Sequence, residues 1–378
     1  MRQASTSRPA SASASRSTAA ADAARLARAK GYPYTRPESS FVFFNGQAYT
    51  FDDSTWQNIQ SLHSVQLTAD AFSGRNHEGF LMSCNPAPVS KSGYLKDEDS
   101  VKQLLEQSSV DAASLLAQDQ TWTPVLAIGS NAGPSQLARK FPAKLFPHGV
   151  LIPALRAVLP DFDVVYAPLV SSYGSATATL EYSPGTKVAV YVTFLTPDLL
   201  ERMDATEGAY FLCELFNINL RLGISLQDFG LGKQAPESLK FIFQYNHQHG
   251  TPHFPILLDG QAAATSPIAI QEIPAADRRF PTLSQTQMQR ALKYLFQNRK
   301  GNTFPALPVA HDAHHSECQE GWKEASEDDL DTWILENLDD SVKRGAIVDA
   351  LTAIARPFGW ESSKIMRTLG DRYAANVA

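Results

Sequence analysis

Five segments rich in β-forming residues limit the fold of this chain more than any other feature. Each contains mainly Val, Thr, Tyr, Phe or Ile, the residues typical of strands. The segment 187–195 is apolar on both faces, which is typical of a central strand. Pro184 and Gly185 indicate a tight turn, so 175–183 and 187–195 are predicted to pair as a hairpin. The five segments are "FDVVYAPLVSS", "SATATLEYS", "KVAVYVTFL", "YFLCELFNINLRL" and "LKFIFQYN", between residues 162 and 246.

Helices are predicted to flank this sheet. Thr196 is a good N-cap residue and Pro197 suits the first helical position, so a helix begins here and ends near Gly208. A later helix is predicted from the Ser284 cap to Gly301. Sheet and helices together predict the α+β class.

The first 38 residues are predicted to be a disordered tail. Residues 1–21 are mostly Ser and Ala with three arginines and no acidic residue, a composition that cannot form a core. The same composition matches an organelle transit peptide, but a flexible tail is the favoured interpretation.

The rest of the chain divides into three parts. Residues 39–118 are predicted to form an N-terminal accessory segment, with a hairpin at Asn45-Gly46 and surface helices within 97–118. Residues 119–300 are the predicted central domain. Residues 301–378 are predicted to be a linker and a helical appendage.

Composition excludes several classes of partner. The chain has 378 residues, 43% hydrophobic content and a net charge of −6, without a dense block of Lys or Arg. Nucleic acid and anionic membrane are therefore not expected as main partners, and a small molecule is favoured. Three scattered cysteines favour a reducing compartment, and the predicted location is cytoplasmic. No apolar run reaches the ~18 residues that a membrane span needs.

A loop of small residues, Gly129-Ser130-Asn131, follows the apolar run "VLAI", and a helix is expected from Gly133-Pro134. Backbone N–H groups at such a turn favour an anion, either a carboxylate or a developing oxyanion. A phosphate loop is disfavoured because no Gly-Lys-Ser/Thr follows.

Glu207 is the second candidate for chemistry. It lies between a predicted helix and the strand that begins at Tyr210, with apolar segments on both sides. A carboxyl group in such surroundings can accept and then return a proton near neutral pH. The alternative, a solvated turn residue, is the interpretation that the local chemistry alone favours.

The order of these features resembles the γ-glutamylcyclotransferase family over about residues 123–300. The matching residues are "AIGSN" at 127–131, "GSATATLEYSPGTKVAVYVTFL" at 174–195, "LLERMDATEG" at 199–208, and Tyr210. The resemblance implies a mixed β-barrel or sheet with flanking helices and a site at its mouth.

The resemblance also implies a reaction and its residues. Gly129, Ser130 and Asn131 would hold the glutamyl group, with Ile128 and Tyr210 beside it, and Glu207 would be the general acid and base. The α-amine of a γ-glutamyl dipeptide, γ-glutamylamine or glutathione would attack its own γ-carbonyl and release 5-oxoproline. The implied reaction needs no metal or cofactor.

One departure from the family pattern leaves an alternative open. Ile128 stands where family members usually have Tyr, so Tyr210 and Tyr173 are the candidates to supply that hydroxyl. A non-catalytic binding module that retains the fold is the alternative to an enzyme. An activity assay with a panel of γ-glutamyl compounds discriminates between the two hypotheses, because only an enzyme releases 5-oxoproline.

Two groups of histidines have spacings that would suit zinc. They are His247, His249 and His253, and His311, His314, His315 and Cys318. Both groups lie in polar, turn-rich sequence, where solvated loop histidines are the favoured interpretation, so a metal-dependent hydrolase is the least favoured hypothesis.

Overall fold

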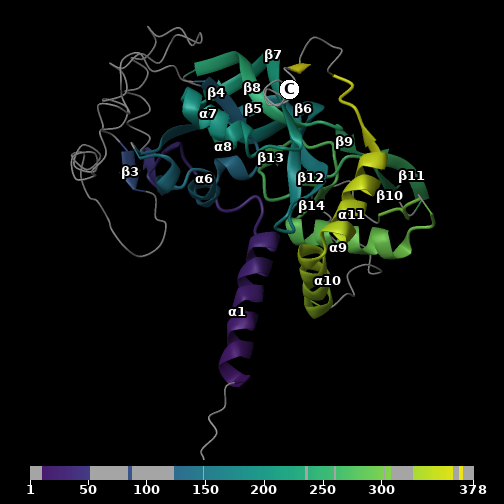
Figure 1. Ribbon diagram of the computed structural model, residues 1–378. Helices are drawn as coiled ribbons and strands as arrows, with labels where there is room; N and C mark the ends of the chain where they lie inside the picture. The colour runs from purple at the N-terminus through teal and green to yellow at the C-terminus, as the bar shows by residue number, and fades with distance from the viewer. Residues whose placement is uncertain are drawn as a thin grey trace, which may run out of the picture.

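The structure is a computed structural model, and its helices and strands are shown in Figure 1. It describes residues 11–51, 84–86, 123–147, 149–234, 237–258, 261–301, 303–307, 327–360 and 366–368. The helices are α1 (Ser11–Lys30), α6 (Pro134–Lys140), α7 (Pro197–Asp204), α8 (Leu226–Gly230), α9 (Gln285–Asn298), α10 (Glu327–Asp339) and α11 (Ser341–Ala353). The longer strands are β1 (Phe41–Phe44), β2 (Gln47–Phe51), β4 (Thr123–Ala127), β5 (Leu151–Val170), β6 (Ala176–Leu195), β7 (Tyr210–Leu222), β8 (Glu237–His247), β10 (Phe254–Leu258) and β11 (Gln261–Ser266).

The central strands form a closed barrel. Strand β6 pairs with β4, β4 with β8, β8 with β7, β7 with β5, and β5 pairs again with β6. The β4–β8 pair is parallel and the others in the ring are antiparallel. A mixed barrel with flanking helices confirms the predicted α+β class, and closure leaves no free edge in the ring.

Strand β6 differs from its prediction. The turn residues 183–186 were expected to connect two paired strands, but both halves of β6 pair with the same neighbour, β5. The register passes from Pro160 opposite Lys187 to Phe162 opposite Tyr182, so the turn is a large bulge opposite Asp161. The Asp161 carboxylate accepts a hydrogen bond from the Gly185 N–H at 2.8 Å. The predicted hairpin is wrong because long-range pairing with β5 outweighs the local turn preference.

The Asn45-Gly46 hairpin prediction is confirmed. Asn45 and Gly46 both have positive φ, and Phe44 pairs with Gln47 across the turn. Strand β1 continues the barrel sheet by pairing with β5. The helices predicted within 97–118 lie outside the described residues.

Two helices begin at the predicted residues. Thr196 is the N-cap of α7 with Pro197 at its first turn, and Ser284 caps α9 through a capping box with Gln287. Leu199 and Met203 of α7 are buried in a hydrophobic cluster that also contains residues of α6, β1 and β4. This cluster fixes α6 and α7 against the outer face of the barrel.

The N-terminal region differs from the predicted disordered tail over its described residues. Residues 11–30 form α1, which extends away from the barrel in Figure 1, and the following segment returns to the barrel wall. Ala29 and Tyr32 are fully or almost fully buried in the main core. The prediction from composition was wrong here because the large apolar side chains that pack on the core, Leu26, Tyr32 and Tyr34, occur only near the end of the segment, where tertiary packing orders them.

The C-terminal helices were predicted to be an appendage, but they contribute to the main core. Leu330, Trp333 and Ile334 of α10, and Ile347 and Leu351 of α11, are buried in the same cluster as the barrel interior. Strand β16 (Met366–Thr368) pairs with β7. None of the helices in the described part of the chain combines the length and apolar character that a membrane crossing requires.

Candidate functional site

One cavity of about 420 Å³ lies beside the end of β4, between the α7–β7 connection and the N-terminal segment. Its volume is suitable for a small polar ligand. The site residues predicted from the sequence all line it, although they come from distant parts of the chain. They are Ile128, Gly129, Ser130, Asn131, Glu207 and Tyr210.

The loop at 129–131 forms a tight turn directly after β4. The Ala132 N–H donates to the Gly129 carbonyl at 3.2 Å, and the Gly133 N–H donates to the Ser130 carbonyl at 2.8 Å. The N–H groups of Ser130 and Asn131 make no hydrogen bond within the described residues. The predicted helix then begins at Pro134 as α6. The turn therefore presents two unused N–H donors at the end of a barrel strand.

Glu207 occupies the connection between α7 and β7, and its side chain is only 12% exposed. Its Oε1 atom accepts a hydrogen bond from Asn131 Nδ2 at 2.8 Å and forms an ion pair with the Lys140 ammonium group. Its Oε2 atom has no partner among the described residues. One carboxylate oxygen is thus held in place, and the other is free to meet a ligand.

Lys140 is a site residue that sequence analysis did not identify. It comes from the last turn of α6, its side chain is 8% exposed, and its ammonium group also lies 3.3 Å from Met203 Sδ. Arg202 Nε donates to the Lys140 carbonyl at 2.8 Å and links α7 to α6. The sequence predicted apolar surroundings for Glu207, and no local pattern indicated a cation there, because the two residues meet only through helix packing.

Asn131 has a polar atom without a partner. Its Nδ2 donates to Glu207, but its Oδ1 is buried and has no hydrogen bond among the described residues. A buried acceptor without a partner is costly, so this atom suits a donor supplied by a ligand. It lies next to the carboxylate, where an ammonium group would find two acceptors.

The two tyrosines predicted to replace the family hydroxyl both line the cavity. The Tyr210 hydroxyl is within 2.8 Å of Thr177 Oγ1, and burial raises its pKa above the ordinary value. Burial also raises the pKa of Tyr173 to about 12. Both phenols are therefore protonated at neutral pH.

A third tyrosine, Tyr32, lies against the turn and was missed by sequence analysis. A Cβ atom added to Gly129 would lie 2.3 Å from the Tyr32 hydroxyl oxygen. Tyr32 follows α1 in a region whose composition predicted disorder. The aromatic run "GYPY" at 31–34 is the signal that indicates a packed segment.

The cavity wall carries more positive than negative charge. Arg28, Arg139, Lys140 and Arg202 line it, and Glu207 is its carboxylate. Lys140 is paired with Glu207, whereas the three guanidinium groups have no ion pair in the part of the chain that the structure describes. The Arg28 guanidinium lies 4.5 Å from the centre of the Tyr173 ring. An anionic ligand is therefore favoured.

The histidines do not form a metal site among the residues described. His247 is buried, and its ring meets Tyr210 edge-on at 5.3 Å between centroids, with His249 at 5.7 Å. No group of three or more His, Cys, Asp or Glu side chains in the described ranges is arranged to hold a metal ion. The second group, His311 to Cys318, lies outside the described residues.

The fold and the cavity together define an α+β barrel protein with a polar cavity at the end of β4. No family model and no curated protein matches the sequence. A solved structure described as uncharacterized protein loc79017 from Homo sapiens aligns with 39% of this chain and 71% of its own, at 17% identity and a TM-score of 0.23. A structure described as gamma-glutamyl cyclotransferase aligns with 54% of this chain and 96% of its own, at 13% identity and a TM-score of 0.25. TM-scores at this level are too low to assign an activity, so function is inferred from the site and the sequence motifs.

Proposed function

We propose that this protein is a cyclotransferase that releases 5-oxoproline from a γ-glutamyl compound. The substrate's α-amine attacks its own γ-carbonyl, a ring closes, and the original amide nitrogen departs as an amine. Nucleophile and electrophile lie in one molecule, so the protein's main task is to hold the substrate folded. Well-oriented intramolecular reactions reach effective molarities of about 10⁵ M or more.

The observation that carries this proposal is the contact between Asn131 and Glu207 inside one cavity. The 2.8 Å hydrogen bond from Asn131 Nδ2 puts the carboxylate directly beside the turn with the unused N–H groups. The free Oε2 of Glu207 and the unpartnered Oδ1 of Asn131 suit the substrate's α-ammonium group. The N–H groups of Ser130 and Asn131 suit its carboxylate or the developing oxyanion.

The proton balance requires one group to act as both base and acid. Glu207 accepts a proton from the α-ammonium, and the amine then forms the new carbon–nitrogen bond to the carbon of the γ-carbonyl group. The ring nitrogen loses a second proton as the amide bond breaks, and both protons finish on the departing nitrogen. Lys140 holds Oε1 throughout, which leaves Oε2 to carry each proton.

The cationic wall favours a substrate whose departing amine carries a carboxylate. The γ-glutamyl end is zwitterionic, so its own carboxylate engages only part of the charge of Arg28, Arg139 and Arg202. A γ-glutamyl dipeptide or glutathione supplies a further carboxylate, and a simple γ-glutamylamine does not. Hydrogen bonds to charged groups contribute about 1.5–3 kcal/mol, or roughly tenfold or more in affinity.

The test is release of 5-oxoproline, measured by mass spectrometry. γ-Glutamyl-alanine and γ-glutamyl-ethylamine are a matched pair that differ by the carboxylate, and glutathione completes the panel. We expect turnover of the dipeptide, a KM about tenfold or more higher for the ethylamide, and a kcat lower by about 10²–10⁴ in Glu207→Gln. Glu201→Gln, on an exposed position of α7, is the matched control and should retain wild-type activity. A wild type that is as inactive as Glu207→Gln on every compound contradicts the proposal and favours a binding module.

A further inference from the structure

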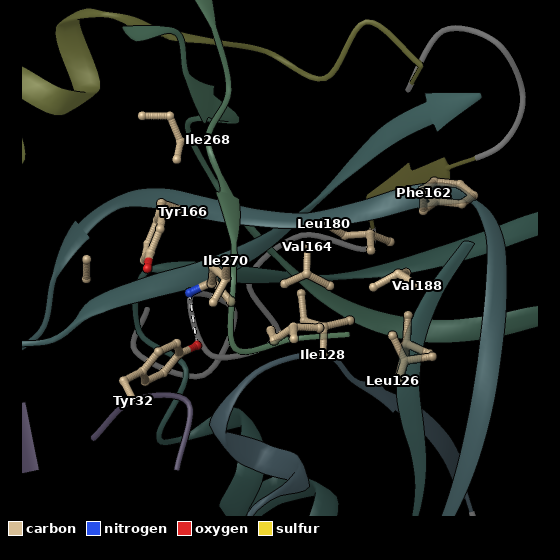
Figure 2. Packing of buried hydrophobic residues seen from close by; sticks show 14 of the residues in the cluster. Tyr32, Leu126, Ile128, Phe162, Val164, Tyr166, Leu180, Val188, Ile268 and Ile270 are labelled. Atoms are coloured by element: carbon tan, nitrogen blue, oxygen red, sulfur yellow. Dashed lines mark hydrogen bonds between the residues drawn. The ribbon is translucent and has the colours of Figure 1, made fainter. Parts of the chain in front are cut away.

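The Tyr32 hydroxyl has an unused donor. Its oxygen accepts a hydrogen bond from the Ala178 N–H at 2.9 Å, the contact drawn as a dashed line in Figure 2. Its own O–H makes no hydrogen bond among the described residues. The residue is 4% exposed, so its hydroxyl group is largely screened from bulk solvent. The O–H of a buried hydroxyl group normally donates a hydrogen bond within the protein, whereas this O–H remains available to donate to a ligand.

The donor lies beside the turn at 129–131. The Tyr32 oxygen occupies the space next to Gly129, where an added Cβ atom would lie 2.3 Å away. Tyr32 lines the same cavity as Glu207 and Asn131. In Figure 2 its ring points from the N-terminal segment toward the barrel core that contains Ile128. Tyr32 therefore forms part of the cavity wall beside the turn, with its hydroxyl oxygen against Gly129.

Buried contacts fix the segment that carries Tyr32. The Ala29 carbonyl, at the end of α1, accepts hydrogen bonds from Ser175 Oγ at 2.9 Å and Gln289 Nε2 at 3.1 Å. Lys30 forms an ion pair with Asp331 of α10. A hydroxyl held this way is pre-organised, which is the condition for stabilising charge that develops only in the transition state.

Desolvation supports a donor role. Burial raises the pKa of Tyr32 well above its ordinary value. The phenol therefore keeps its proton at neutral pH.

We propose that Tyr32 is a catalytic residue that donates its O–H to the γ-carbonyl oxygen as negative charge develops there, so the N-terminal segment completes the active site. This inference rests on the cyclotransferase function proposed above. In the addition step, the electron pair of the carbonyl moves to oxygen and is stabilised by the Tyr32 O–H without transfer of its proton. The pair returns when the bond to the departing nitrogen breaks.

The first test is Tyr32→Phe, which removes the oxygen and keeps the ring. Loss of one oxyanion donor typically costs about 10²–10³ in kcat, so we expect a fall of this size with KM within about threefold of wild type. Rates are normalised to the folded fraction. Tyr49→Phe is the matched control, because it removes a phenol that hydrogen-bonds to Gln47 outside the cavity, and its kcat should be unchanged.

A second variant separates catalysis from structure, since Tyr32→Phe also removes the acceptor of the Ala178 N–H. A difluorotyrosine at position 32 keeps the oxygen and lowers the pKa of the phenol. We expect it to recover most of the lost kcat and to move the alkaline limb of the pH–rate profile to lower pH, which a purely structural oxygen would not do. Two results would contradict the role of Tyr32: a kcat within threefold of wild type in Tyr32→Phe, or an alkaline limb that difluorotyrosine does not move. If wild type is still more active than Glu207→Gln, the cyclotransferase function is unaffected by either result. A wild type without activity instead overturns the cyclotransferase function itself.

Discussion

The two walls of the cavity differ in how the chain builds them. One wall comes from the barrel and its connections, with the 129–131 turn, Glu207 and Tyr210 within a stretch of about eighty residues. The other comes from the N-terminal segment, with Arg28 and Tyr32, almost a hundred positions earlier than the turn. The barrel wall consists of short motifs next to strands. The N-terminal wall has only the aromatic run at 31–34 as a sequence signal, and it depends on packing against α9 and α10. Short sequence motifs therefore predict one wall of the cavity but not the other.

The largest expected effect tests the ion pair of the barrel wall. Lys140→Met leaves Glu207 without its cation in a site where both side chains are nearly buried, and we expect a loss of about 3 kcal/mol in the free energy of unfolding. Denaturant unfolding measures it. The double variant Lys140→Met/Glu207→Gln should recover most of the loss, and Lys144→Met, at an exposed position, should change stability by less than about 0.5 kcal/mol. An equal loss in the single and double variants would show that the pair is not the cause.

The next largest expected effect comes from the contact between the two walls of the cavity. Gly129→Ala forces a Cβ against the Tyr32 hydroxyl, and overpacking of this kind costs about 1–3 kcal/mol. The cost should shrink in the Tyr32→Phe background, where the ring carbon Cζ lies 3.3 Å from the added atom. A double-mutant cycle by denaturant unfolding gives the coupling. Gly208→Ala, whose Cβ meets nothing within 4 Å, is the control; additive costs at Gly129 and Tyr32 would mean that the walls are independent.

The barrel wall should also be the acid-sensitive one. Burial lowers the pKa of His247, behind Tyr210, to about 4. Between pH 6.5, the ordinary pKa of histidine, and about pH 4, His247 binds a proton in the unfolded chain but not in the folded chain. The free energy of unfolding therefore falls as the pH falls through this range. This contributes up to about 2 kcal/mol between pH 7 and pH 5. His247→Asn should reduce the change in unfolding free energy between pH 7 and pH 5 by that amount. If the variant shows the same pH dependence as wild type, residues other than His247 cause the acid sensitivity.

The smallest expected effects concern the contacts that hold the N-terminal wall in place, one buried and one exposed. Ser175→Ala removes a buried hydrogen bond to the Ala29 carbonyl and should cost about 1 kcal/mol. Arg25→Ala breaks exposed ion pairs with Asp22 and Asp339 and should cost less than about 0.5 kcal/mol, falling further at high salt. Thermal unfolding at two salt concentrations checks both. A larger loss for Arg25→Ala than for Ser175→Ala would reverse the ranking of buried and exposed anchors.

Local patterns were sufficient for several elements because their causes are local. Thr196, Ser284 and the Asn45-Gly46 turn satisfy nearby backbone groups, and their helices and hairpin occur where predicted. The hairpin at Pro184-Gly185 failed because the partner of both halves of β6 is β5, which precedes it in the chain. A turn preference of this size yields to a long ladder of strand pairs.

The sequence by itself determined the α+β class, the strands of the barrel and the residues of one cavity wall, since strand composition, caps and small-residue turns act over a few neighbouring positions. Only the tertiary structure decided that Lys140 pairs with Glu207, that α1 is anchored by Ser175 and Gln289, and that Tyr32 meets Gly129. Those contacts join segments from about 65 to 260 residues apart, as their sequence separations show. The burial that holds them arises from the packing of the whole core, and no local pattern encodes it.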